Sequence, residues 1–163
     1  MNYNSNLSNI ILKSNIIAYK TLKEIMFYIN NINYFFLSKG YIGYLVECFY
    51  NYSFNNKANC DLPVLGIEIK TIALNEKKEP YNSIFICSLS QNMFLFNWEK
   101  SVLYNKIKHI LWVPYYSYDK NILNYRFLKP FFYKMNNNDL NKIKKDSVEL
   151  LNLFYFSEFL LLF

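Results

Sequence analysis

The chain has 163 residues, of which 53% are hydrophobic and 20% aromatic, and its formal net charge is +6. This length suits one domain with a buried core, and the composition excludes a globally disordered chain. A basic surplus suits a polyanionic partner such as DNA or an acidic membrane surface. Asn, Lys, Ile, Tyr and Phe are all abundant and use A/T-rich codons, so a mutational bias explains the same surplus without any selection for DNA.

The cysteines and the two ends of the chain exclude several classes of protein. Cys48, Cys60 and Cys87 are far apart and form no C-x-x-C pair, so they predict neither a disulfide framework nor a zinc site. Residues 1–17 show no signal-peptide pattern, and we expect a cytoplasmic protein. The apolar segment 148–163 contains glutamates and is shorter than the roughly 20 residues of a membrane span, so it predicts a buried or partner-binding helix.

Helical spacing of apolar residues occurs in four segments of the chain. The first of these segments, which begins at residue 9, is expected to form one continuous helix. The predicted helices cover residues 9–31, Gly40 to about Tyr52, 98–106 and 139–153.

Strand patterns occur between these helices. Residues 66–72 alternate strictly between apolar and polar side chains, and residues 83–89 are expected to pair with them as an antiparallel strand. Residues 109–116 are nearly all apolar, as a central strand would be. The order of the elements predicts an α+β fold, with a small mixed sheet flanked by helices.

Asp61, Glu68 and Lys70 form the pattern D-x6-E-x-K. Glu68 and Lys70 are two apart on a predicted strand, so their side chains leave the same face, and Asp61 can fold back beside them. Two carboxylates that meet repel each other unless a divalent cation lies between them, and hard oxygen ligands suit Mg²⁺. A lysine there can orient the attacking water or neutralise phosphoryl charge. Such residues on one strand face can equally form a solvated ion pair.

Three further residues lie near this pattern. Glu47 can add a third carboxylate, or it can be an exposed charge on its helix. Lys106 and Lys108 precede the third strand, where a lysine can contact a DNA phosphate. The alternative is a solvated flank of a buried strand, which we favour for Lys108. His109 begins the same strand and is expected to be buried or at its rim, rather than a catalytic base.

Four segments occur in the order and approximate spacing of the MutH family of mismatch-repair endonucleases, which the chain resembles. The combination G-[IV]-E-[IL]-K-T, followed by K-[IL]-K-x-[IV]-L-W-[IV]-P, is specific. The segments are KGYIGYLVE (39–47), DLPVLGIEIKTI (61–72), SIFIC (83–87) and WEKSVLYNKIKHILWVP (98–114). The resemblance implies a restriction-endonuclease-like core of the PD-(D/E)xK architecture. We expect one domain over residues 1–163, with its core at 16–116 and a divergent or truncated part at 117–163.

The resemblance also implies a role for each candidate residue. Asp61 and Glu68 would ligate Mg²⁺ together with the backbone carbonyl of Ile69, and Lys70 would position the attacking water. The other expected active-site residues are Glu47, at an additional acidic position, and Lys106, at a second lysine position. The residues expected to contact DNA are Lys39 and Lys57 at basic positions, Phe85 at an aromatic position, and Lys108.

The function implied by the resemblance is Mg²⁺-dependent nicking of the unmethylated strand at hemimethylated GATC sites. The expected partners are double-stranded DNA and a MutL-type activator, with no membrane, and the expected state is a monomer. The sequence departs from the family at Asn82, where relatives tend to carry an acid, and in the short loop at 91–96. The chain is also expected to lack the C-terminal arm that reads GATC.

Two alternative functions stay open. A chain without the reading arm could be a truncated, inactive remnant that binds DNA through its lysines. Independently of any resemblance, a small basic α+β domain could use its aromatic surface and apolar tail to bind a protein or a membrane.

Overall fold

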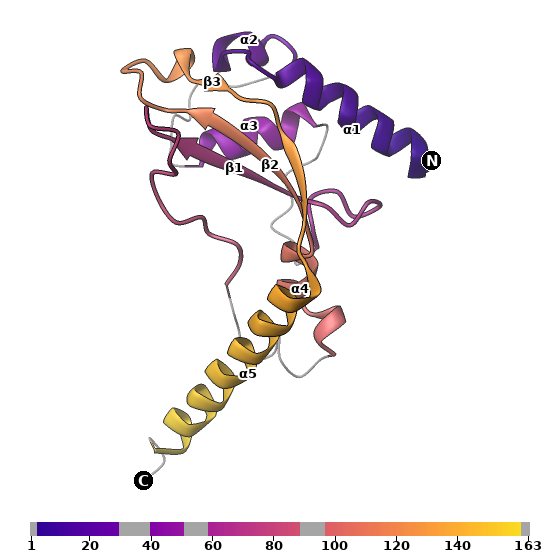
Figure 1. Cartoon of the computed structure of the whole chain (residues 1–163), viewed down its shortest axis with the longest axis vertical. Coiled ribbons are helices and arrows are strands. Elements are labelled where there is room, and N and C mark those ends of the chain that lie inside the picture. Colours follow the sequence, from indigo (N-terminus) through magenta and orange to yellow (C-terminus); the bar gives the residue numbers. More distant parts are fainter. Residues whose placement is uncertain (1–2, 30–39, 51–58, 89–96, 161–163) are drawn as a thin grey trace.

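The computed structural model describes residues 3–29, 40–50, 59–88 and 97–160, and every structural statement below concerns these ranges. Figure 1 shows helices at both ends of the chain and a small sheet between them. The α-helices are α1 (Tyr3–Ile17), α2 (Leu22–Met26), α3 (Tyr41–Phe49), α4 (Val102–Ile107) and α5 (Asn137–Leu160), and the short 3-10 helices are η2 (Trp98–Lys100) and η3 (Ile122–Asn124). The strands are β1 (Glu68–Leu74), β2 (His109–Tyr116), β3 (Arg126–Phe127) and β4 (Phe131–Lys134).

The sheet is mixed, and β2 is its central strand. β1 runs parallel to β2, with Glu68 opposite Ile110 and Leu74 opposite Tyr116. On the other side, β4 pairs antiparallel with the first half of β2 and β3 with its end. The predicted α+β class, the strand near 66–72 and the central strand at 109–116 are thereby confirmed. Strands β3 and β4 have no counterpart among the sequence predictions.

The predicted strand at 83–89 is wrong for residues 83–88, which form no strand; residue 89 lies outside the described residues. After β1 the chain turns back, and the amide of Tyr81 donates to the carbonyl of Ala73 at 3.0 Å. Leu74 makes a single antiparallel bridge with Pro80, and the pairing goes no further. Proline has no N–H to contribute to such a ladder. The regular partner of β1 is β2, which pairs with it along its whole length.

The helix predicted over 9–31 is also wrong in its continuity. α1 ends at Ile17, and α2 begins at Leu22 behind a capping box in which Thr21 and Glu24 bind each other's backbone amides. Tyr19, between the helices, has a left-handed φ of 66°. Its amide donates to the carbonyl of Phe127 at 2.9 Å, so the linker pairs with a strand more than a hundred residues later in the chain.

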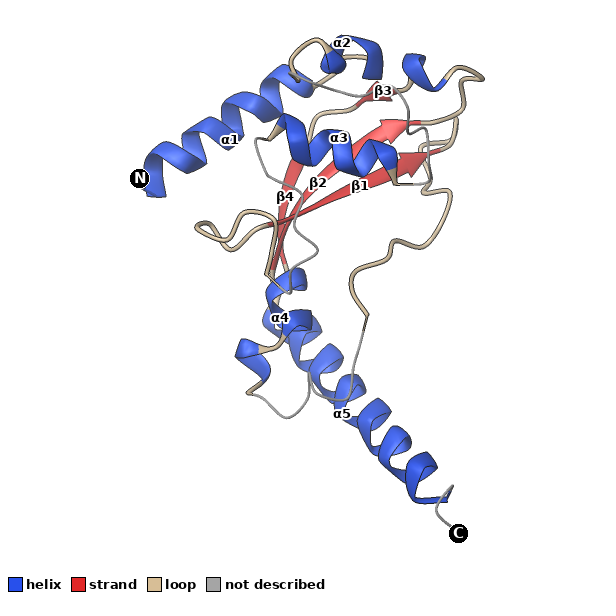
Figure 2. Cartoon of the chain, turned by 180° about the vertical axis from the view of Figure 1, so that it is seen from behind, coloured by secondary structure: helices blue, strands red, loops and turns tan. Residues whose placement is uncertain are grey.

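The core lies between the sheet and the helices that cover one of its faces. Figures 1 and 2 show α3 lying across the strands, with α1 and α2 beyond it. Side chains with no exposed surface come from each layer: Ile17, Leu22, Ile25, Leu45, Val46, Leu111, Val113 and Phe127. The helix predicted from Gly40 is confirmed as α3, and its apolar stripe forms the centre of this core.

The last helix extends away from the sheet in both cartoon views. The segment predicted as a helix at 139–153 lies inside α5, which is longer at both ends. Ser147 and Leu151 are buried, whereas Val148, Leu150 and Leu153 are between 44% and 66% exposed. Within the described ranges, none of the helices has the length and apolar character needed to cross a membrane.

Candidate active site

A tight turn places Asp61 beside the start of β1. The amide of Leu62 donates to the carbonyl of Ile67 and the amide of Ile67 donates back, at 2.8 and 3.2 Å. Gly66 closes the turn at a φ of +64°, a conformation that glycine adopts without steric cost. The Oδ2 atom of Asp61 then accepts the amide of Ile69 at 2.8 Å. The hairpin therefore supplies the fold-back that the D-x6-E-x-K spacing predicts.

Glu68 is a buried carboxylate held by two lysines. Its side chain is 1% exposed, and its Oε1 atom lies 2.8 Å from the amine of Lys70 and 2.9 Å from that of Lys106. Lys70 follows on the same face of β1, and Lys106 comes from the last turn of α4, which Ser101 caps at its start. Among the described residues, the Oε2 atom of Glu68 is buried without a hydrogen-bond partner. Buried polar atoms rarely stay unpaired in proteins.

Glu47 reaches the same region from α3. Burial raises the pKa of Glu47 to about 7, helped by the negative charges of Asp61 and Glu68 and opposed by the charge of Lys70. Burial and the charge of Glu68 also raise the pKa of Asp61, against the hydrogen bond from the Ile69 amide. Burial and the charge of Glu68 thus disfavour the ionised forms of both Asp61 and Glu47.

The charge of Glu68 acts in the opposite sense on Lys106. Burial lowers the pKa of this amine, but the hydrogen bond and the negative charge of Glu68 outweigh burial and leave the pKa raised. The cation of Lys106 is therefore stabilised at the site. In the described residues, no group of three or more His, Cys, Asp or Glu side chains already forms a metal-binding cluster.

A cavity of about 430 Å³ opens beside these groups, lined mainly by residues of β1, α3 and the segment 82–85. Glu47 and Lys70 line it, together with Phe85, which is 72% exposed. The aromatic residue expected near DNA thus lies at the mouth of the site. The remaining lining residues are Gly40, Gly43, Ile69, Thr71, Ala73, Asn82, Ser83, Ile84 and Tyr115.

Two members of this neighbourhood have no predicted role. Cys87 is half-buried, and burial raises the pKa of its thiol, against the positive charge of nearby Lys106. Tyr115 lines the cavity from β2, although its sequence position shows only an apolar strand. No pattern in the sequence identifies them, because their placement depends on the parallel register of β1 and β2 and on the path of the 82–87 segment.

Of the remaining residues expected to contact DNA, the structure describes Lys108. Lys108 is half-buried, and its amine donates to Asn105 at 3.0 Å and lies 5.4 Å from the ring centre of Tyr104. His109 is half-buried at the start of β2, and burial together with Lys108 and Lys134 lowers its pKa. The predictions for Lys39 and Lys57 fall outside the described residues.

Comparison with known proteins adds independent evidence. The profile of the family described as "DNA mismatch repair enzyme MutH" matches residues 50–146, more than half of the chain. The MutH protein of Pectobacterium atrosepticum is 31% identical over 118 residues, which are 71% of this chain and 51% of that protein. The MutH protein of Buchnera aphidicola is 38% identical over 80 residues, 47% of this chain and 36% of that protein. The chain spans about half the length of the curated relatives it matches, or less.

Proposed function

This chain belongs to the MutH family of DNA mismatch repair enzymes, and from this premise we propose that it is a Mg²⁺-dependent DNA endonuclease. Its substrate would be double-stranded DNA with hemimethylated GATC sites, of which it would nick the unmethylated strand. A MutL-type protein would activate it, and it would act in the cytoplasm as a monomer. The observation that carries the proposal is the buried Glu68, which two lysines hold and whose negative charge acts on Asp61 and Glu47.

The residues present fit a divalent cation. Within the described part of the chain, the Oε2 atom of Glu68 is a buried oxygen without a hydrogen-bond partner, while Oε1 already has two lysines. Asp61 and Glu47 have raised pKa values because like charges and burial oppose their ionisation. A cation among these oxygens would relieve both penalties, and carboxylate oxygens are the ligands that Mg²⁺ prefers. Asp61 and Glu68 would hold the ion, with the carbonyl of Ile69.

Each side chain of the site would have a distinct role in hydrolysing a phosphodiester bond. A bound divalent ion would supply charge stabilisation at the phosphate and lower the pKa of a water molecule. The amine of Lys70 would orient the attacking water and donate a hydrogen bond to the phosphoryl oxygens. Lys106 would hold the carboxylate of Glu68 in position, since its amine and that of Lys70 bind the same carboxylate oxygen. Phe85, at the exposed edge of the cavity, would contact the DNA beside the cut.

The test is nicking of a supercoiled plasmid in Mg²⁺, with and without a MutL-type protein. Substrates would be unmethylated, hemimethylated or fully methylated at GATC. The variants would be Asp61→Asn and Lys70→Ala, with Lys77→Ala as control, because Lys77 lies in the exposed turn after β1. We expect the control to nick like the parent protein and each site variant to lose at least a hundredfold in rate.

The outcomes separate the functions that the sequence leaves open. Nicking that requires Asp61 and Lys70 and spares fully methylated DNA supports the whole proposal. Nicking that requires both residues but ignores methylation supports a nuclease without GATC reading. A folded protein that binds DNA and never nicks it would be the inactive remnant, and the proposed activity would then be wrong.

A further inference from the structure

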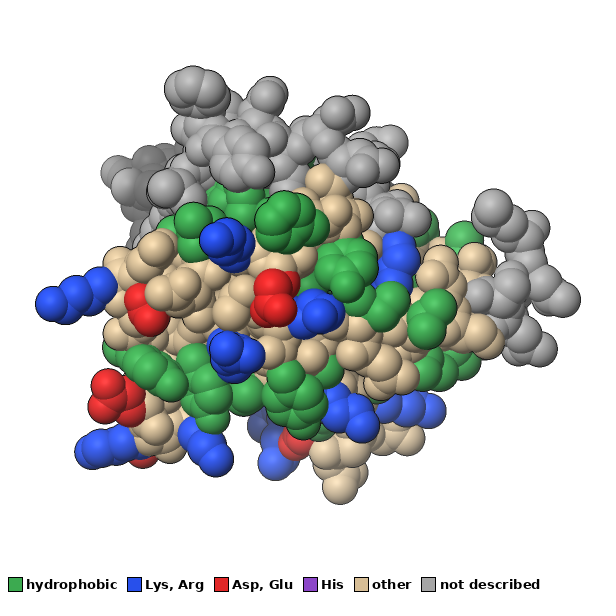
Figure 3. Space-filling model, turned by 90° about the horizontal axis from the view of Figure 1, so that it is seen from above, with side chains coloured by type: hydrophobic (Ala, Val, Ile, Leu, Met, Phe, Trp, Pro, Cys, Tyr) green, Lys and Arg blue, Asp and Glu red, His purple; other side chains and the backbone are tan. Residues whose placement is uncertain are grey.

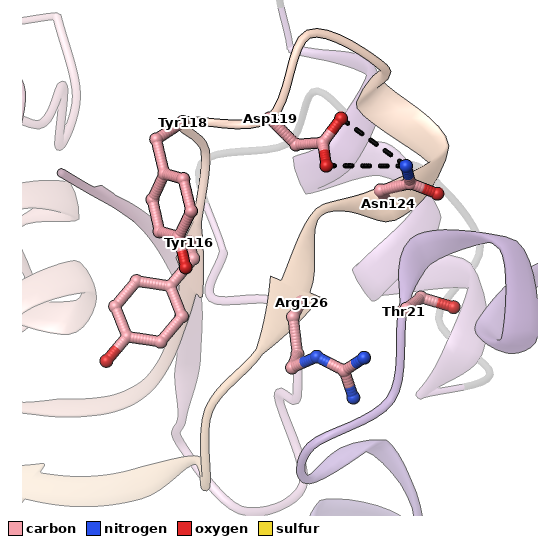
Figure 4. A pocket seen from close by; sticks show the side chains of 6 residues that line it. All are labelled: Thr21, Tyr116, Tyr118, Asp119, Asn124 and Arg126. Carbon is pink, nitrogen blue, oxygen red and sulfur yellow. Dashed lines mark hydrogen bonds between the residues drawn. The ribbon is translucent and has the colours of Figure 1, made fainter. Parts of the chain in front are cut away.

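A second cavity, of about 310 Å³, lies at the other end of the central strand from the candidate active site. Glu68 is opposite Ile110 near the start of β2, whereas Tyr116 ends this strand and lines the cavity. Six residues of extended chain span about 20 Å, so the two sites are separate. The residues around the cavity, shown in Figure 4, are Thr21, Tyr116, Tyr118, Asp119, Asn124 and Arg126.

Arg126 forms the donor side of this cavity and is held in place by the backbone. Its Nη1 atom donates to the carbonyl of Tyr19 at 2.7 Å, and its strand bridges to Thr21. A guanidinium has five N–H donors in a rigid plane. Among the described residues, the contact with Tyr19 is the one hydrogen bond that this side chain makes, so further donors are available to a ligand.

Asp119 forms the acceptor side. Its Oδ1 atom accepts the amide of Asn121 at 2.7 Å, and both carboxylate oxygens lie within 3.4 Å of the Nδ2 atom of Asn124. Figure 4 shows this pair on the loop that faces Arg126. A carboxylate offers about four lone-pair sites, so accepting capacity remains after these contacts. The loop thus presents a fixed acceptor opposite a fixed donor.

Two tyrosines form a third side. The rings of Tyr116 and Tyr118 lie 5.5 Å apart at 55°, and Tyr118 is 51% exposed. Figure 4 shows both rings on one side of the cavity, across from the guanidinium of Arg126. Exposed aromatic rings near an arginine stack unpaired bases in proteins that bind single-stranded nucleic acid.

The charges around the cavity are balanced. Asp119 lies across from Arg126, and the charge of Arg126 also acts on Glu24. Seen from above, this end of the molecule has acidic, basic and apolar side chains interspersed over its described surface (Figure 3). Such a surface does not favour a phosphate chain, which binds to clustered positive charge. It favours a neutral planar ligand that has donors on one edge and acceptors on another.

We propose that this cavity binds a guanine base. The O6 and N7 atoms of guanine accept two parallel hydrogen bonds from an arginine, the commonest specific contact between proteins and bases. Its N1–H and 2-amino groups are adjacent donors that match a carboxylate such as Asp119. Adenine and cytosine lack this combination of edges. The guanine could belong to a free nucleotide or to an unpaired position in DNA.

The test is calorimetric titration of the full chain with dGMP, dAMP and dCMP, without a divalent cation. All three ligands carry the same phosphate, so differences among them report the base alone. We expect dGMP to bind at least tenfold more tightly than the other two. Asp119→Asn keeps an acceptor for the Asn121 amide but presents an NH₂ group to guanine, and Tyr118→Leu removes an aromatic face. Each should weaken dGMP binding at least tenfold, whereas Lys120→Ala, on the same loop, should leave it unchanged.

Competition would identify the source of the base. An oligonucleotide with one unpaired guanine that displaces dGMP, while the fully paired duplex does not, would assign the cavity to DNA; no displacement by either would assign it to free nucleotide. Equal affinity for dGMP and dAMP, or variants that bind dGMP like the parent, would overturn the proposal. So would a zwitterionic amino acid that binds while dGMP does not. The Asp61→Asn variant should bind dGMP like the parent protein. The failure of the nuclease proposal can therefore be distinguished from the failure of the guanine-binding proposal.

Discussion

Lys106 donates a hydrogen bond to the Oε1 atom of Glu68 at 2.9 Å, although the two residues lie 38 positions apart in the chain. Lys70 binds the same oxygen at 2.8 Å, so one buried carboxylate joins the end of α4 to the start of β1. This contact stabilises the metal-free site and aims both amines at one point. It also leaves the second oxygen of Glu68 available to a cation.

Glu68→Gln is expected to destabilise the metal-free protein, because both amines lose their counter-charge and then repel each other. Breaking a fully buried pair costs about 3–5 kcal/mol. Since the two lysines are 20% and 14% exposed, we expect roughly 1–3 kcal/mol here. Urea denaturation would measure the change. Glu149→Gln is the control, because its ion pair with Lys145 is exposed and should contribute less than about 0.5 kcal/mol. Equal stability of the Glu68 variant and the parent would contradict the buried pairing.

Asp61→Asn is expected to separate cation binding from folding. The amide oxygen of asparagine can still accept the N–H of Ile69, and the lost charge no longer repels Glu68, so stability should stay within about 0.5 kcal/mol of the parent. Calorimetric titration with Mg²⁺ or Mn²⁺ should show binding by the parent and none by this variant. Asp61→Ala also removes the acceptor and should cost about 1–3 kcal/mol in urea. Unchanged cation binding by Asp61→Asn would exclude this carboxylate as a ligand.

Two glycines are expected to respond in opposite directions to alanine. Gly66 has a φ of +64°, which costs an L-residue about 1 kcal/mol. Among the described residues, its added Cβ would meet the side chain of Lys108, with Cε at 3.5 Å and Nζ at 3.8 Å. These are ordinary contacts, so the penalty is conformational. Gly43 lies inside α3, where an added Cβ would have Thr71 Oγ1 as its nearest neighbour at 3.8 Å, and alanine should stabilise by about 1 kcal/mol. Denaturant midpoints of both variants would show whether the hairpin needs its left-handed residue.

The stability of the metal-free protein is expected to fall as the pH rises toward 7. The pKa of Glu47 is about 7 in the folded chain against an ordinary value of 4.5, so between these values the folded state binds more protons than the unfolded state. The stabilising effect of this group is complete below about pH 4.5 and is lost as the pH passes 7. The raised pKa of Asp61 acts in the same sense.

Urea denaturation of the parent and of Glu47→Gln at several pH values would isolate this contribution. The free energy of unfolding of the parent, relative to that of Glu47→Gln, should fall as the pH rises from about 4.5 through 7 and become constant about one pH unit above the folded pKa. Saturating Mg²⁺ should remove the change, because a cation favours the ionised carboxylate. A difference that does not vary with pH would show that Glu47 ionises normally.

Much of the candidate site can be predicted from the sequence, because its signals are local. The alternation around Glu68 and Lys70 indicates a strand with both side chains on one face, and β1 begins at Glu68. The apolar run at 109–116 indicates a central strand, and β2 has these bounds. Side chains of a strand point alternately to its two faces, so burial of one or both faces leaves a pattern within the strand's own sequence. That pattern can be recognised without knowing which strands lie beside it.

The tertiary structure alone decides the contacts that make these residues a site. Parallel pairing of β1 with β2 places the end of α4, which leads into β2, beside Glu68 at the start of β1. The interruption between α1 and α2 at Tyr19 depends on backbone hydrogen bonds to Phe127. The ion pairs of Lys70 and Lys106 with Glu68 depend on the position of α4. Such contacts join segments that are far apart in the chain. The residue pattern of one segment does not show which other segment it will pack against. Local periodicity therefore predicts the elements, and burial of the shared core decides their partners.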